Sequence, residues 1–117
     1  LPKNNYAWSK LGAESAVKMY HNSLILRVSM TERPFIHKHA FADMKTNFIF
    51  HDEFIKIFKK VLTKKGVLNI GGPSTTVYEF AKNYNTKVKK KYLKKENKIK
   101  LTMNTSMNLA KLKKYLQ

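Results

Sequence analysis

The order of apolar and polar positions predicts a helix and then a buried strand at the start of the chain. Between residues 6 and 21, apolar side chains recur every three or four positions, which is the spacing of one buried helical face, and Asn4 or Asn5 can cap the start. The unbroken apolar run over residues 24–29 is rich in branched side chains and predicts a strand buried on both faces. A helix followed at once by such a strand is typical of a parallel α/β sheet.

The middle of the chain combines an irregular segment with a clearly amphipathic one. Residues 30–47 have no helical or strand period, so they predict a long loop, and loops of this length are usually functional or mobile. Residues 48–50 predict a short extended piece. A helix is then expected from Asp52, as its cap, to residue 64, because apolar residues form one stripe and lysines fill the opposite face.

The last part of the chain predicts four further elements. Residues 67–70 read as a second buried strand, and residues 76–84 as a helix that begins with the capping-box pattern Thr-x-x-Glu. Residues 87–93 predict an edge strand, because Lys87, Lys89 and Lys91 alternate with Val88, Lys90 and Tyr92. Residues 94–100 predict a loop, and Ser106 is expected to cap a final helix.

The formal charge of +17 raises the question of a polyanionic partner. All but two of the 24 basic residues are lysine, the exceptions being Arg27 and Arg33. Lysine, asparagine and isoleucine are the residues that an AT-rich genome favours, whereas arginine is the main reader of bases and phosphates. The composition therefore favours genome bias and solvation over nucleic-acid binding, and attraction of a small anionic substrate stays open.

The cysteine count and the hydropathy restrict the class of protein further. The chain has no cysteine, so a disulfide framework and a cysteine-based metal site are excluded. No stretch approaches the roughly 20 apolar residues of a membrane helix, and the first residues have no signal-peptide core. We therefore expect a cytoplasmic protein without membrane contact.

Tyr6 and Lys10 are the first candidates for chemistry. Residues four apart on a helix share one face, with about 6 Å between their β-carbons. An ammonium group beside a phenol stabilises the phenolate, so such a tyrosine can donate or accept a proton near neutral pH. The alternative is a surface tyrosine whose ring packs on a lysine stem. Glu14, one turn further along, could pair with Lys10 or with Lys18, which would weaken the effect of Lys10 on Tyr6.

Three segments in a fixed order carry a family resemblance. "NNYAWSKLGAE" (4–14) leads through a helix to "LILRVS" (24–29), "KGVLNIGGPSTTVYEFAK" (65–82) combines a strand, a Gly-Gly turn and a helix, and "MNTSMNLAKLKKYL" (103–116) ends the chain. Together they resemble the extended short-chain dehydrogenase/reductase family, and within it the sugar-nucleotide reductases of the dTDP-4-dehydrorhamnose reductase type. The resemblance covers nearly the whole chain.

The resemblance implies an activity and roles for two residues. The chain would be the catalytic-helix and substrate-binding portion of an NAD(P)-dependent reductase of a 4-keto-deoxysugar nucleotide, or of an epimerase built likewise. Tyr6 would exchange a proton with the sugar oxygen. Lys10 would stabilise the Tyr6 phenolate and hold the nicotinamide ribose of NAD or NADP, which supplies the hydride.

The resemblance also implies what is missing. The family begins with βαβ units that carry a glycine-rich phosphate loop, and the four glycines of this chain form no such loop. We therefore expect an α/β fold that is the C-terminal part of a Rossmann-like parallel sheet plus a small substrate-binding subdomain, with the N-terminal dinucleotide-binding units absent. As one domain, it would comprise the catalytic helix and strand (1–30), a substrate loop (31–51) and a C-terminal α/β portion (52–117). Such a portion would be inactive without an N-terminal half or a partner copy.

The long loop supplies the candidates for substrate binding, a nucleotide sugar being the expected ligand. Its basic side chains could meet a diphosphate, since arginine in particular suits bidentate phosphate contacts. The candidates are Arg33, His37, Lys38, His39 and Lys45. The alternative is a solvated basic loop. No metal site is expected, because His37-x-His39 with Asp43 offers no fourth ligand.

Two other classes of function stay open. The basic surface could bind a nucleic acid or another polyanion, in which case affinity should fall steeply with salt. Alternatively, the chain could be a non-catalytic remnant that self-associates through a bare sheet edge.

Overall fold

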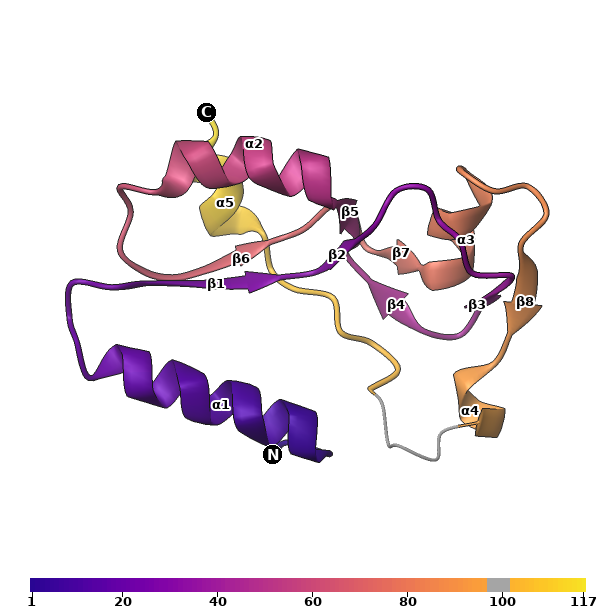
Figure 1. Ribbon diagram of the computed structural model, residues 1–117, viewed down its shortest axis with the longest axis horizontal. Coiled ribbons are helices and arrows are strands. Elements are labelled where there is room, and N and C mark those ends of the chain that lie inside the picture. The colour runs from indigo at the N-terminus through magenta and orange to yellow at the C-terminus, as the bar shows by residue number, and fades with distance from the viewer. Residues whose placement is uncertain (97–101) are drawn as a thin grey trace.

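The computed structural model describes residues 1–96 and 102–117 as a mixed α/β fold, 44 × 32 × 21 Å in extent (Figure 1). Four pairs of strands form small sheets within these residues, three of them parallel and one antiparallel. In chain order the elements are α1 (Asn5–Lys18), β1 (Leu24–Val28), β2 (Met30–Thr31), β3 (His39–Phe41), β4 (Lys45–Thr46), β5 (Ile49–Phe50), α2 (His51–Val61), β6 (Gly66–Ile70), β7 (Thr75–Thr76), α3 (Val77–Lys82), β8 (Lys89–Lys91), α4 (Leu93–Glu96) and α5 (Ala110–Tyr115).

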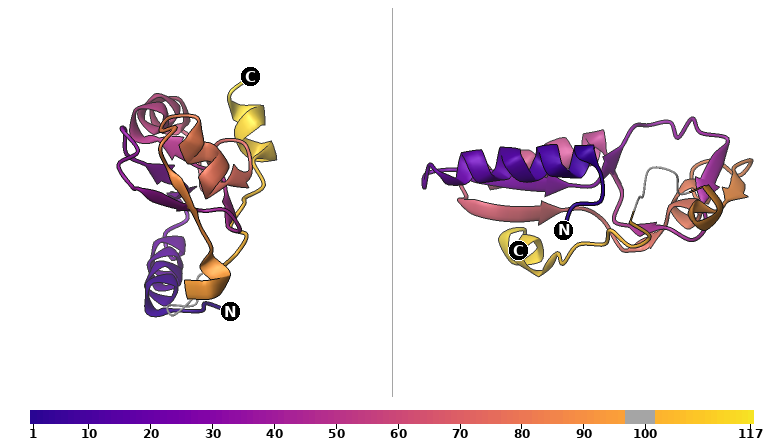
Figure 2. Two further views of the ribbon diagram at one scale, coloured as in Figure 1. Left: turned by 90° about the vertical axis from the view of Figure 1, so that its right-hand side faces the viewer. Right: turned by 90° about the horizontal axis from the view of Figure 1, so that it is seen from below.

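The longest sheet pairs the two strands that the apolar runs predicted. β1 and β6 are parallel and in register from Leu24 opposite Gly66 to Val28 opposite Ile70, with α2 between them in the chain. Viewed along the strands, α1 and α2 lie on one side of this sheet and α5 lies on the other (Figure 2). A parallel pair connected by a helix is the arrangement that the sequence predicted. The predicted burial of β1 on both faces is wrong, because none of its five residues is fully buried, whereas β6 buries Leu68 and Ile70.

Burial of this sheet creates the first of two hydrophobic clusters. Its fully buried members come from β5, the end of α2, β6 and α5, and they are Ile49, Val61, Leu68, Ile70 and Leu112. Side chains from β1 and the apolar stripe of α2 pack against them. Phe54, Ile57 and Val61 of the stripe therefore face the sheet, as their spacing predicted. Phe58 and Leu62, which the same spacing placed on the stripe, are exposed instead.

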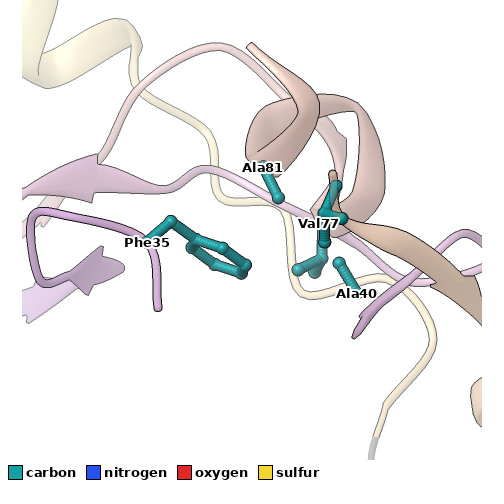
Figure 3. Packing of buried hydrophobic residues seen from close by; sticks show 5 residues of the cluster. Phe35, Ala40, Val77 and Ala81 are labelled. Atoms are coloured by element: carbon teal, nitrogen blue, oxygen red, sulfur yellow. The ribbon is translucent and has the colours of Figure 1, made fainter. Parts of the chain in front are cut away.

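The second cluster lies around α3, β3 and β8 (Figure 3). Phe35 and Ala40 from the middle segment meet Val77 and Ala81 from α3, and Val88 precedes β8. Segments from the middle and the end of the chain thus form one core, which fixes the β3–β8 pair on the surface of α3.

The prediction that residues 30–47 are an irregular loop is wrong. β2 pairs with β5, β3 with β8 and β4 with β7. These strands have only two or three residues, too few to show a period in the sequence. Their partners lie elsewhere in the chain, so the pairing is decided by tertiary contacts.

The helix ends agree with the sequence in part. Asn4 caps α1 through the Ala7 N–H at 2.8 Å, and Thr76 caps α3 through the Glu79 N–H at 3.1 Å, as predicted. α1 ends earlier than expected, at Lys18, and the buried face predicted for it is wrong, because none of its residues is fully buried.

At two other helix starts the expected cap is wrong. α2 begins at His51, and Glu53 Oε1 accepts the Phe50 N–H at 3.1 Å, so Asp52 lies within the helix instead of capping it. α5 begins at Ala110, whose N–H is accepted by Asn108 Oδ1 at 2.9 Å, so Ser106 does not cap it. The Ser106 hydroxyl is instead hydrogen-bonded to the Ser74 hydroxyl.

The basic segment after β8 also differs from its prediction. β8 is an edge strand, as the alternating lysines predicted, but it spans only Lys89–Lys91. α4 (Leu93–Glu96) occupies the start of the expected loop 94–100. The remainder of that loop, residues 97–100, lies outside the described residues.

A buried asparagine joins three distant segments behind the Gly-Gly turn. Asn47 is 2 % exposed; its Nδ2 donates to the Gly72 carbonyl at 3.1 Å and its Oδ1 accepts the Met107 N–H at 2.6 Å. The neighbouring glycine is required by space, because a β-carbon at Gly71 would lie 2.6 Å from the Asn47 carbonyl oxygen. The Gly-Gly turn packs closely on Asn47, and Asn47 in turn holds the C-terminal segment through its bond to Met107.

Among the described residues, no helix has both the length and the apolar content needed to cross a membrane.

Candidate active site

α1 stands away from β1 and leaves a groove between them. None of its side chains is fully buried, and in Figure 1 it runs alongside β1 on the side away from β6. The groove has a volume of about 630 Å³ and is open to solvent. Its walls come from α1, β1 with the next two residues, and the C-terminal segment, and consist of Tyr6, Lys10, Ala13, Glu14, Val17, Ile25, Leu26, Arg27, Val28, Ser29, Met30, Thr105 and Met107.

Tyr6 and Lys10 lie together at this groove. The Lys10 Nζ is 5.4 Å from the centroid of the Tyr6 ring, and both side chains line the same wall. Tyr6 is 71 % exposed, so its hydroxyl is accessible to a ligand in the groove. The helical spacing that suggested the pair is thus realised, with both groups on the face of α1 that borders β1.

Glu14 does not pair with Lys10. Its carboxylate accepts two hydrogen bonds from Arg27 on β1, from Nε at 2.7 Å and from Nη2 at 2.8 Å. These bidentate bonds lower the pKa of Glu14, with a smaller coulombic contribution from the charge of Arg27. The pair ties α1 to β1 across the groove and leaves the Lys10 ammonium beside the Tyr6 ring.

One edge of β1 has no strand partner among the described residues. β1 pairs with β6 on its other edge only. Residues 25–28 of β1 and Ser29, which follows it, line the groove. The groove walls are mostly apolar there, with Ala13 and Val17 of α1 facing the strand. An open edge beside an apolar wall is a place where a further strand could pair.

Of the wall residues of this groove, the sequence indicated only Tyr6, Lys10 and Glu14 as candidates for chemistry. Arg27 is one of only two arginines and lies within an apolar run, which was a usable signal for a paired charge. Thr105 and Met107 come from the other end of the chain. Their position depends on the Asn47 bond to the Met107 backbone, for which the sequence holds no local signal.

The substrate-binding candidates of the middle segment do not gather at the groove. Arg33 stacks on the Phe50 ring, 3.8 Å from its centroid, and pairs with Asp52 at 3.3 Å and Glu53 at 3.8 Å. These contacts bind Arg33 to the start of α2. His37 packs edge-on against Phe35, with 5.3 Å between ring centroids.

Of the other three candidates, His39 and Lys45 lie on strands, and Lys38 directly precedes β3. The Lys38 carbonyl accepts the Lys89 N–H at 2.9 Å, and His39 lies on β3. Lys45 lies on β4, where its backbone bonds to Met103 and Thr105, and Thr105 in turn lines the groove. Within the described residues, none of the five candidates is a wall residue of the α1–β1 groove.

The glycines form no phosphate-binding loop, and the Asp43 carboxylate bonds to backbone N–H groups. Gly12 lies within α1, Gly66 opens β6 with a positive φ of 91°, and the Gly-Gly turn packs on Asn47, so none of them cradles a phosphate. The Asp43 carboxylate accepts the N–H groups of Leu93 and Lys94 at 2.8 and 3.1 Å. Over residues 1–96 and 102–117, no three His, Asp or Glu side chains are placed to hold a metal ion.

No protein-family model matches the chain, and no curated protein matches it significantly.

Proposed function

We propose that this chain is the catalytic-helix and substrate-binding portion of an NAD(P)-dependent sugar-nucleotide reductase, with Tyr6 and Lys10 as its catalytic pair. The β1–α2–β6 unit would then be the C-terminal part of a Rossmann-like sheet. The substrate class is a nucleotide sugar with a keto group.

One observation carries the proposal: the Tyr6 ring and the Lys10 ammonium are 5.4 Å apart on the wall of one accessible groove. A phenol needs a neighbouring cation and an open path to exchange a proton with a ligand. The Glu14–Arg27 pair supports the same role, because it keeps the nearest carboxylate away from Lys10.

The groove residues have separate roles in the proposed reaction. The Tyr6 hydroxyl gives a proton to the carbonyl oxygen of the sugar as that oxygen gains negative charge. The Lys10 ammonium stabilises the phenolate that remains and can donate hydrogen bonds to ribose hydroxyls.

The residues fit one end of a nicotinamide dinucleotide. The groove offers Tyr6 and Lys10 to the nicotinamide ribose, and a dinucleotide, when bound, supplies the hydride. No described residue offers a glycine-rich cradle for the pyrophosphate. In this proposal the cradle comes from other polypeptide, and the open edge of β1 is where its sheet would join.

Reconstitution with a separate half tests the proposal. The chain is co-expressed with the N-terminal dinucleotide-binding half of a sugar-nucleotide reductase, and oxidation of NADH or NADPH is followed with a 4-keto-deoxysugar nucleotide. Tyr6→Phe removes only the hydroxyl, so we expect a rate loss of about 10²- to 10⁴-fold. Tyr20→Phe is the matched control, because Tyr20 follows the same helix, is 62 % exposed and is not a groove residue.

A binding measurement separates failed assembly from a wrong site. Nicotinamide mononucleotide is titrated into the 117-residue chain alone, with saturation transfer read by NMR. Transfer should be reduced in Lys10→Met and retained in Lys18→Met, since Lys18 does not line the groove. A reconstituted Tyr6→Phe enzyme with the parent rate, or equal transfer in both lysine variants, would refute the assignment.

A further inference from the structure

The side of α1 that faces away from the groove carries an apolar surface. Successive residues of a helix are about 100° apart, so the residues opposite the groove wall share one face. We refer to it as the outer face of α1, and it consists of Trp8, Leu11, Gly12, Ser15 and Met19. Its three apolar side chains are 52 %, 44 % and 89 % exposed, in chain order. In Figure 1, α1 lies at the lower left edge of the molecule, with β1 above it.

The outer face is nearly free of charge, although the chain has a formal charge of +17. Of the three charged residues of α1, Lys10 and Glu14 lie in the groove wall, and only Lys18 borders the outer face. Two copies of this chain repel each other through their net charge. They can therefore meet at an uncharged apolar surface, whereas an acidic partner would be attracted to the lysines elsewhere. The charge distribution favours a second copy of the chain at the outer face.

Small residues in the middle of the outer face allow another helix to come close. A β-carbon built at Gly12 would have nothing within 4 Å, so the helix surface is open there. The Ser15 hydroxyl donates to the Leu11 carbonyl at 2.9 Å, so it keeps a hydrogen-bond partner if the face is covered. Helix axes approach to about 8 Å where the side chains at the contact are small.

We propose that the outer face of α1 pairs with the same face of a second copy of this chain, with the two helices antiparallel. A two-fold axis that passes midway between Gly12 and Ser15 places Gly12 opposite Ser15 of the second copy, and Trp8 opposite Met19. A thioether against an aromatic ring is a favourable contact. The groove faces the other way, so the dimer leaves it open and is independent of the proposed reductase activity.

The size of the face and the charge of the chain determine how strong this dimer is and how it responds to salt. Stable complexes bury about 800 Å² of each partner and one helix pair covers less, so we expect a dissociation constant on the order of 0.1 mM. Salt should strengthen the dimer, because the Debye length falls from about 10 Å at 0.1 M to about 3 Å at 1 M and the repulsion between copies falls with it. Binding through ion pairs would show the opposite dependence.

The fluorescence of Trp8 tests the proposal, because Trp8 is the only tryptophan of the chain and lies on the outer face. The full chain is diluted across the expected dissociation constant, from about 1 mM to about 5 μM, and its mass is measured by sedimentation equilibrium. The Trp8 emission should shift to shorter wavelength as the mass rises from monomer to dimer, because the ring leaves water. At about 0.5 M salt both changes should occur at lower protein concentration.

Two serine variants of α1 locate the interface. Ser15→Lys should weaken the dimer by about tenfold or more, because the two-fold axis brings the two new ammonium groups close together. Ser9→Lys is the matched control: Ser9 is exposed and, like Ser15, donates to a backbone carbonyl of its own helix, but it lies about 120° away around α1. Ser9→Lys should dimerise like the parent. Circular dichroism confirms that both variants keep the parent fold.

Three results would overturn the proposal. These are a monomer at about 1 mM protein in high salt, a dimer that forms without a change in the Trp8 emission, or equal dissociation constants for Ser15→Lys and Ser9→Lys. The last two would place the contact on another surface, such as the open edge of β1.

Discussion

Replacing Asn47 with alanine should destabilise the protein more than its small size suggests. The side chain is 2 % exposed and makes two hydrogen bonds, to the Gly72 carbonyl and to the Met107 N–H. Alanine removes both bonds and leaves two backbone groups without partners in a partly buried position. Each such group costs about 1 to 3 kcal/mol, and partial rehydration favours the lower end, so we expect a loss of about 2 to 4 kcal/mol.

The loss is large compared with the total stability of a small domain, about 5 to 15 kcal/mol. Urea unfolding followed by far-ultraviolet circular dichroism measures it as a lower midpoint with an unchanged m value. Asn85→Ala is the control: Asn85 Oδ1 accepts only the nearby Lys87 N–H at 3.1 Å, so its loss should be about 0.5 to 1 kcal/mol. A loss below about 1 kcal/mol for Asn47→Ala would show that the C-terminal segment is not held by this residue.

Two further predictions concern glycine and charge. Gly71→Ala should cost about 1 to 3 kcal/mol in the same assay, because its β-carbon would lie 2.6 Å from the Asn47 carbonyl oxygen, whereas Gly12→Ala should gain about 0.5 to 1 kcal/mol, since nothing lies within 4 Å. Equal effects at both glycines would contradict this. The bidentate bonds from Arg27 lower the pKa of Glu14 from its ordinary 4.5, so the ion pair stabilises the fold above that pH and is lost as pH falls below it. The stability difference between the parent chain and Glu14→Gln should therefore shrink between neutral pH and about pH 3, and a difference that does not change with pH would refute the role of the pair.

Much of the local structure could be predicted from the sequence because its causes are local. The two apolar runs became β1 and β6, and the caps Asn4 and Thr76 lie where their side chains can reach the first turn of a helix. The Tyr6–Lys10 pair could also be found in advance, because four residues along a helix place two side chains on one face.

The same local rules failed where a competing group was available. Asp52 was a reasonable cap, but Glu53 accepts the Phe50 N–H and starts α2 earlier. Ser106 had the right chemistry for a cap, yet its hydroxyl bonds to Ser74, which the Gly-Gly turn brings close.

In the α1–β1 groove, the sequence predicted the reactive pair, and the tertiary structure determined the partner of Glu14. The sequence indicated Tyr6, Lys10 and the possible interference of Glu14, but not which cation Glu14 would choose. Glu14 pairs with Arg27 because β1 lies across the groove from α1, and because a planar guanidinium can donate two hydrogen bonds to one carboxylate. That choice keeps Lys10 available to Tyr6.

By itself, the sequence determined α1, α2, α3 and α5, the positions of β1 and β6, and the chemical character of α1, because these depend on side-chain patterns within a few residues. Only the tertiary structure decided that Arg33 would stack on Phe50 and that residues 30–47 would form strands. The physical reason is that short strands and charged side chains have many partners of similar energy. The packing of the two hydrophobic clusters selects among them.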